Sequence, residues 1–256
     1  MRLIEVALKL QQKLAKKVVI CPLMPPGQNI PVEKRSEPSE VPTLAQPPYH
    51  TLPIRDPAFS PWLVAATDLG IRKDSYTAAI AVYRLNVFAD GSSELELIEE
   101  VVHIGKTSSI RFPYIPGFLS FREIPPLVRA FKKLKTTPHV ILCDGQGIAH
   151  PRKIGLASHL GLILKKPSIG CAKNKLCGTH AELPPEKGSW AKLIHNNEVV
   201  GAVYRSRTGV KPIYISPGHL TDLPSSIALV ELCLGRYRIP EPLRRAHMLS
   251  NYTDYP

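Results

Sequence analysis

The 256-residue sequence has no uninterrupted apolar run long enough to span a bilayer, and its first residues lack a secretory hydrophobic segment. Its five cysteines lack the spacing of a zinc site, and their odd number and apolar neighbours are typical of reduced thiols. These absences argue against a membrane span, a structural zinc and a disulfide framework. We therefore expect a cytoplasmic protein that does not bind membranes.

Acidic residues are scarce, with 21 Asp and Glu against 33 Lys and Arg, which gives a formal net charge of +12. A positive excess of this size favours polyanionic partners, nucleic acid first and an anionic membrane surface second. Charge alone does not establish binding, because some proteins are simply basic.

The length suits one large α/β domain or two small ones. Residues 3–18 have the apolar spacing of an amphipathic helix, which we expect to lie on its own domain. Residues 22–57 hold ten of the 26 prolines and cannot form a helix or a central strand. We expect a single domain over residues 1–256, with a proline-rich insert at about 22–57.

After the insert, the pattern predicts three antiparallel strands, followed by helices that alternate with strands. The fold class is therefore α/β, with a central mixed sheet flanked by helices. The expected strands cover residues 63–67, 77–85, 95–102, 140–143, 168–171, 190–194, 199–205 and 212–216. The expected helices cover residues 116–123, 125–135, 154–164 and 224–234.

The segment DGQGIAHPRK begins with Asp144, directly after the apolar run 140–143. A carboxylate that ends a buried strand lies at the edge of the sheet where α/β proteins place their sites. His150 follows in the same loop, and Arg152 and Lys153 are candidates to receive phosphates. The segment has the composition of a site for a phosphodiester, although a plain polar loop would also fit.

Asp68 and Glu123 also lie at predicted element ends, like Asp144. Three carboxylates come together favourably only around a cation, and oxygen ligands suit Mg²⁺ or Mn²⁺. His150 could orient water or protonate a leaving oxygen, and Lys173 could neutralise charge on a phosphate. Without such a site, the same residues would be caps, an exposed ion pair, a loop histidine and a solvated lysine.

The aromatic cluster FPYIPGFL, residues 112–119, places Tyr114 between two prolines before a helix. A stiff aromatic side chain can wedge into a base stack when a base is extruded. Packing of the cluster on the core is the alternative.

Two segments, FPYIPGFLSFRE (112–123) and DGQGIAHPRKIGLASHL (144–160), resemble the central motifs of the endonuclease V family of inosine-directed nucleases. The resemblance extends, in the family's order, to EVALKLQQKLAKKV near the start of the chain and to ATDLG, IGCAK, SPGH and RIPE. It implies a ribonuclease H-like fold and dependence on Mg²⁺, with Mn²⁺ as a substitute. It also implies hydrolysis of the second phosphodiester bond 3′ to hypoxanthine, in repair of deaminated adenine in DNA.

The resemblance assigns catalytic roles residue by residue. Asp68, Glu123 and Asp144 match the family's metal-binding carboxylates. His150 matches its catalytic histidine, and Lys173 matches the lysine near the scissile phosphate.

The same resemblance assigns substrate-binding roles. Tyr114 matches the wedge tyrosine, and Gly117, Leu119 and Gly145 match positions that line the hypoxanthine pocket. His219 matches a further site histidine.

Two departures from the family's pattern leave questions open. Segment 22–57 is longer than expected, and His139 stands where an Asp is expected, which leaves one-metal and two-metal chemistry open. The segments resemble bacterial members, which favours inosine-containing DNA over RNA as the partner of a monomeric enzyme. An inosine-specific endoribonuclease, a nuclease that ignores inosine and a non-catalytic basic nucleic-acid-binding module are the alternatives.

Overall fold

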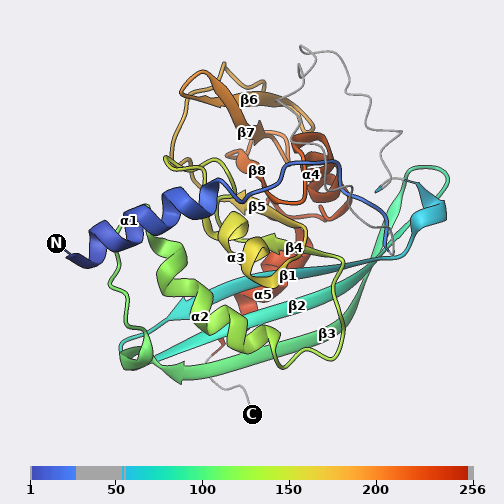
Figure 1. Cartoon of the computed structure of the whole chain (residues 1–256). Helices are drawn as coiled ribbons and strands as arrows, with labels where there is room; N and C mark the ends of the chain where they lie inside the picture. Colours follow the sequence, from blue (N-terminus) through green and yellow to red (C-terminus); the bar gives the residue numbers. More distant parts are fainter. Residues whose placement is uncertain (1, 27–53, 55, 253–256) are drawn as a thin grey trace.

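The computed structural model describes residues 2–26, 54 and 56–252. An eight-stranded sheet runs through this part of the chain, in the order β3-β2-β1-β4-β5-β8-β7-β6 (Figure 1). Its strands are β1 (Trp62–Ile71), β2 (Ser75–Val87), β3 (Ser93–Lys106), β4 (Val140–Cys143), β5 (Ser168–Ala172), β6 (Trp190–His195), β7 (Glu198–Tyr204) and β8 (Ile213–His219). The helices are α1 (Arg2–Ala15), α2 (Leu119–Phe131), α3 (Leu156–Leu164), α4 (Leu223–Leu232) and α5 (Glu241–Asn251).

The sheet is mixed, as the sequence predicts. Strands β1, β4 and β5 are parallel neighbours, whereas β1–β2, β2–β3 and β5–β8 pair antiparallel. Gly91 turns β2 into β3 with a φ of +80°, a conformation that glycine adopts without a steric penalty. The expected meander followed by alternating helices and strands is confirmed.

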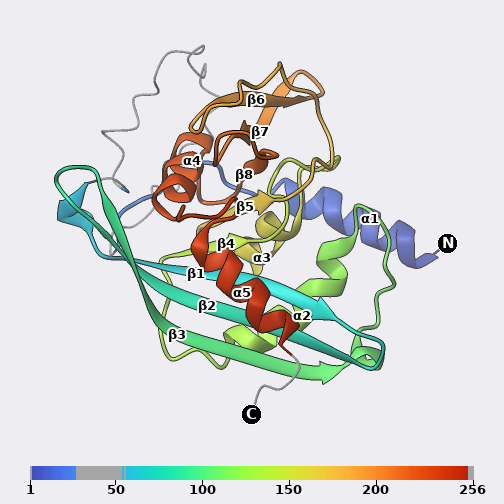
Figure 2. The same cartoon turned by 180° about the vertical axis from the view of Figure 1, so that it is seen from behind.

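The core lies in two layers, one on each face of the sheet. Ala65, Ile141 and Cys143 pack against α2 and α3, whereas Ala66 and Leu142 face the side covered by α4 and α5. The two views from opposite sides show α2 and α3 in front of the sheet and α5 behind it (Figures 1 and 2). Side chains therefore alternate between two buried faces, which explains the near-continuous apolar runs of the central strands.

Strand β1 is longer than predicted. The sequence suggests an end at Asp68, but the strand continues to Ile71 because its pairing with β2 extends to Ile71 and Tyr76. Pairing with β4 stops at Thr67 and Cys143. Asp68 therefore lies inside a strand, at the level where its parallel neighbour ends.

Helix α2 replaces the two helices that were expected over 116–135. Pro125 and Pro126 lie inside it, although each proline removes one backbone N–H donor from the helix. Ile124, Leu127 and Ala130 are buried against the sheet. This packing keeps the helix continuous through the two prolines.

Helix α1 lies on the body of the protein, as expected, and buries Ala7 and Gln11. The chain after it is fixed to β8 and α4, since Val19 N donates to His219 Nδ1 at 3.2 Å and Leu23 N donates to Ser225 Oγ at 3.1 Å. Most of the proline-rich insert, residues 27–53 and 55, lies outside the described residues. Within the described part of the chain, no helix is long and apolar enough to cross a membrane.

Candidate functional site

Two carboxylates lie side by side at one edge of the sheet. The parallel register pairs Thr67 of β1 with Cys143 of β4, so Asp68 and Asp144 follow at the same level. The backbone N–H of Asp144 donates to Thr67 O at 3.4 Å and holds this alignment. Strand pairing thus brings together two acidic residues that are far apart in the sequence.

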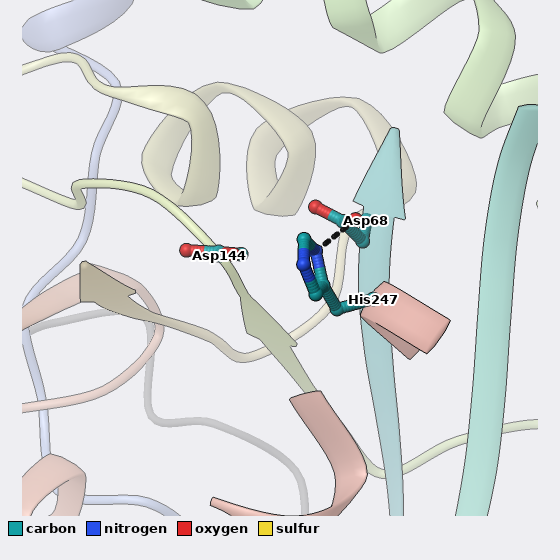
Figure 3. Close-up of side chains that lie close together, drawn as sticks. All are labelled: Asp68, Asp144 and His247. Atoms are coloured by element: carbon teal, nitrogen blue, oxygen red, sulfur yellow. Dashed lines mark hydrogen bonds and ion pairs between the residues drawn. The ribbon is translucent and has the colours of Figure 1, made fainter. Parts of the chain in front are cut away.

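His247 joins the two carboxylates from the C-terminal helix. Its Nδ1 donates to Asp68 Oδ2 at 3.0 Å, and one ligand atom from each of Asp68, Asp144 and His247 lies within 4.8 Å of the other two. Figure 3 shows the imidazole reaching from α5 toward both carboxylates. The carboxylate side chains are about 15% and 14% exposed and the imidazole 51%, so the group is open on one side.

The placement of His247 depends on α5, an element that the sequence analysis does not predict. Leu243, Ala246 and Leu249 are buried, and they fix this helix against β1 and β2. Ser250, one turn after His247, donates its hydroxyl to Asp68 Oδ2. The apolar spacing 243, 246 and 249, which is typical of one buried helix face, could have predicted this helix, but it does not predict that His247 and Ser250 meet Asp68.

The electrostatics of the group favour a cation. Burial, together with the negative charges of Asp68 and Asp144, raises the pKa of Glu123 to about 8. Burial also raises the pKa of Asp144, although Lys173 Nζ lies 2.5 Å from its Oδ2 and opposes the shift. Glu123, on α2, is close enough for its charge to matter, but its oxygens do not belong to the group within 4.8 Å.

The donor set fits a divalent metal ion. Carboxylate oxygens are the ligands that Mg²⁺ and Mn²⁺ prefer, whereas an imidazole nitrogen more often binds transition-metal ions. A bound cation would offset both the burial and the neighbouring carboxylate charges that raise the pKa values of Asp144 and Glu123. Asp68, Asp144 and His247 therefore form a group that could hold a metal ion.

A cavity of about 380 Å³ opens beside Asp144. Seven of the ten site residues expected from the sequence line it, among other residues: Tyr114, Gly117, Leu119, Asp144, Gly145, His150 and Lys173. The carboxylate group and the cavity therefore share Asp144, so a ligand in the cavity lies next to a possible metal.

His150 is buried and neutral. Its Nε2–H donates to Gly117 O at 2.9 Å, and its Nδ1 accepts from Arg152 N at 3.1 Å, which fixes the tautomer. Burial and the positive charge of Arg152 lower the pKa of His150 to about 4, against an opposing contribution from the Gly117 carbonyl.

The two cations after His150 have partners within the protein. Arg152 donates through Nε to Gln11 and through Nη2 to Gly117 O, and its guanidinium lies 4.3 Å from the centre of the Phe118 ring. Lys153 pairs with Glu198. The sequence suggested that both cations could receive phosphates, but in the structure Arg152 binds α1 and the Gly117 carbonyl, and Lys153 binds the start of β7.

The aromatic cluster divides into two parts. Phe112, Phe118 and Phe121 stack on one another, with ring centres 5.3 to 6.4 Å apart, as the packing alternative predicts. Tyr114 is 69% exposed at the rim of the cavity. The phenylalanines anchor the loop, and the tyrosine is free to contact a ligand.

The structure does not bring His219 to the cavity. The imidazole is buried, accepts from Val19 N and does not line the cavity. Its visible role is to hold the segment that follows α1.

We predict that the His150 ring titrates near pH 4, well below the ordinary value of 6.5. The unfolded chain would then bind a proton at a higher pH than the folded protein does. The free energy of unfolding should therefore fall as the pH drops from about 6.5 toward 4. An NMR titration of the ring signals, assigned with His150→Gln, measures the midpoint. A midpoint near 6.5 would show that the ring is solvated.

Comparison with known proteins agrees with this geometry. The family model for Endonuclease V matches residues 53–248. Endonuclease V of Rippkaea orientalis is 51% identical over 191 residues, which cover 73% of this chain and 79% of that protein. The crystal structure of endonuclease V from Streptomyces avermitilis has 33% identity and a TM-score of 0.73, and the match covers 96% of this chain and 90% of that one.

The same fold occurs in endonuclease V of Ciona intestinalis, solved with a 24mer DNA containing an inosine followed by a ribo-adenosine. That structure is 22% identical, with a TM-score of 0.69 over 98% of this chain and 97% of that one. The fold is the ribonuclease H-like arrangement that the sequence motifs implied. From the match to the family model and the identity to its members, this chain belongs to the endonuclease V family.

Proposed function

We propose that this protein is a metal-dependent endonuclease that hydrolyses the second phosphodiester bond 3′ to deoxyinosine, in repair of deaminated adenine in DNA. The observation that carries the proposal is the shared position of Asp144. It belongs both to the group that could hold a metal ion and to the wall of the adjoining cavity. If a base entered the cavity, the phosphodiester backbone beside it would lie near the residues that could hold the metal ion.

Mg²⁺ is the proposed cofactor, with Mn²⁺ as a substitute. Asp68 and Asp144 would hold the ion, with His247 as a third ligand and Glu123 contributing charge from α2. When bound, such an ion polarises a phosphoryl oxygen and lowers the pKa of an attacking water. Lys173, 2.5 Å from Asp144, would offset negative charge on the scissile phosphate.

For His150 we propose a hydrogen bond from Nε2–H to the leaving oxygen. The ring is neutral, so this N–H would stabilise the developing negative charge while the proton stays on the ring, but the N–H is now committed to Gly117 O. The ring must therefore release this carbonyl, or share the N–H with the substrate, as the bond breaks. The Gly117 carbonyl would therefore help to position the catalytic histidine.

The cavity would receive the flipped base. Hypoxanthine differs from adenine by presenting O6 and N1–H, and backbone groups near Gly117 and Gly145 can read that edge. Leu119 would pack against the ring. Tyr114, exposed at the rim, would fill the space that the base leaves in the stack. For His219 we propose an indirect role, in which its ring holds the segment after α1 in place.

DNA is the proposed substrate class, because the curated relatives that match at about half identity are bacterial, like the motifs themselves. We also propose a monomeric cytoplasmic enzyme in which the whole chain acts as one domain. Support for the single domain comes from Gln11 of α1, which contacts Arg152 in the loop after β4. An inosine-specific endoribonuclease is the nearest alternative, and a non-catalytic basic nucleic-acid-binding module is the more distant one.

The first test of the proposal is Asp144→Asn. This variant should lose cleavage of inosine-containing DNA in Mg²⁺ and keep most of its affinity, which comes mainly from contacts with phosphates. Asp90→Asn, in the turn between β2 and β3, is the matched control and should cleave like the parent. Cleavage by purified Asp144→Asn at the parent's rate would refute the metal assignment. Parallel cleavage assays with inosine-containing RNA and with undamaged strands test the endoribonuclease alternative and the nuclease that ignores inosine.

The second test is Tyr114→Ala. We expect it to weaken binding to inosine-containing strands by about 1–3 kcal/mol, the scale of one base–aromatic contact, with a much smaller effect on undamaged strands. Tyr252→Ala, which removes another exposed tyrosine, should change neither affinity. Fluorescence anisotropy with both strands measures the difference. An equal loss on both strands would make Tyr114 a general backbone contact or a structural residue.

A further inference from the structure

Gln11 is a fully buried polar side chain on α1, a helix that lies outside the residues matched by the family model. Both ends of its amide are used. Nε2 donates to Gly117 O at 2.9 Å, and Oε1 accepts from Arg152 Nε. A buried amide that serves two loops far away in the sequence is more than a packing residue, since an apolar side chain of similar size would fill the space without the cost of desolvating an amide.

The Gly117 carbonyl is the meeting point of the network. It accepts from Gln11 Nε2, from His150 Nε2 at 2.9 Å and from Arg152 Nη2 at 2.5 Å. Gly117 has a φ of +79°, and a Cβ on it would lie 2.9 Å from Arg152 Nη2. The carbonyl therefore points into the cluster through a backbone conformation that glycine permits.

We propose that Gln11 is a positioning residue for cleavage: it holds the Gly117 carbonyl and Arg152 in place, and these two in turn fix the ring of His150. Arg152 reaches the ring through its backbone N–H on Nδ1, and Gly117 reaches it through the carbonyl on Nε2. Gln11 thus binds directly the carbonyl that contacts Nε2, and it binds the side chain of the residue whose backbone N–H contacts Nδ1. This inference rests on the proposed nuclease function.

The length and chemistry of glutamine suit this place. The side chain needs one donor and one acceptor, which Gln supplies from a single planar amide. Methionine has a similar length and neither group. Asparagine has both groups but is one methylene shorter, so it cannot reach both loops from the same backbone position.

Gln12, the next residue on the same helix, is exposed and provides matched controls. The four variants are Gln11→Met, Gln11→Asn, Gln12→Met and Gln12→Asn, made in the full chain. We expect kcat on inosine-containing DNA to fall at least fivefold in folded Gln11 variants, with KM within threefold of the parent. The Gln12 variants should keep the parent's kcat.

A loss of less than fivefold in kcat, a loss confined to KM, or an equal loss in the Gln12 variants would overturn the proposal. So would unfolding of both Gln11 variants, judged by circular dichroism, because Gln11 would then be a structural residue. Should the parent itself fail to cleave, the nuclease proposal fails separately. The NMR signals of the His150 ring then decide the role of Gln11: a change in the Gln11 variants alone supports positioning, and no change refutes it.

Discussion

The repulsion between carboxylates at the edge of β1 and β4 is the constraint on which the rest of the site depends. Asp68 and Asp144 are held level by strand register, and Glu123 on α2 lies close enough that their negative charges add to burial in raising its pKa to about 8. The fold stabilises this arrangement only in part, through Lys173 on Asp144 and through Ser250 and His247 on Asp68. Burial and, to a smaller extent, the neighbouring carboxylate charges raise the pKa values of Glu123 and Asp144, and a divalent cation is the partner that would offset both.

Helices from the two ends of the chain complete the site from different sides. Near the C-terminus, α5 brings His247 to the carboxylates, and near the N-terminus α1 brings Gln11 to the wall of the cavity. The segments between them supply the strands and the two motif loops. The chemistry would therefore need both ends of the described chain docked on the sheet, which ties activity to the folding of the whole domain.

Much of the fold could be predicted from the sequence because its signals are local. A continuous apolar run indicates the buried strand 140–143, and turn residues indicate the turn at Asp90 and Gly91. A helical period of apolar residues indicates α1. Two predictions were wrong where tertiary contacts prevailed. Pairing with β2 carries β1 past Asp68, and packing on the sheet keeps α2 continuous through Pro125 and Pro126.

The site was predictable where motif residues also line the cavity, and less so where geometry alone brings residues together. His247 and Ser250 come to Asp68 only because α5 packs against β1, a contact that no local pattern shows. Arg152 seemed available for phosphate because its partner Gln11 is far away in the sequence. His219 belongs to a matched motif, but its ring binds the backbone after α1.

The most direct test of the central claim is Mn²⁺ binding to the nucleic-acid-free protein, followed by electron paramagnetic resonance. The account predicts that the parent and Asp90→Asn bind Mn²⁺ alike, and that Asp68→Asn and His247→Gln each weaken the same site at least tenfold. Unchanged Mn²⁺ binding in both Asp68→Asn and His247→Gln would contradict the claim that these side chains hold the metal.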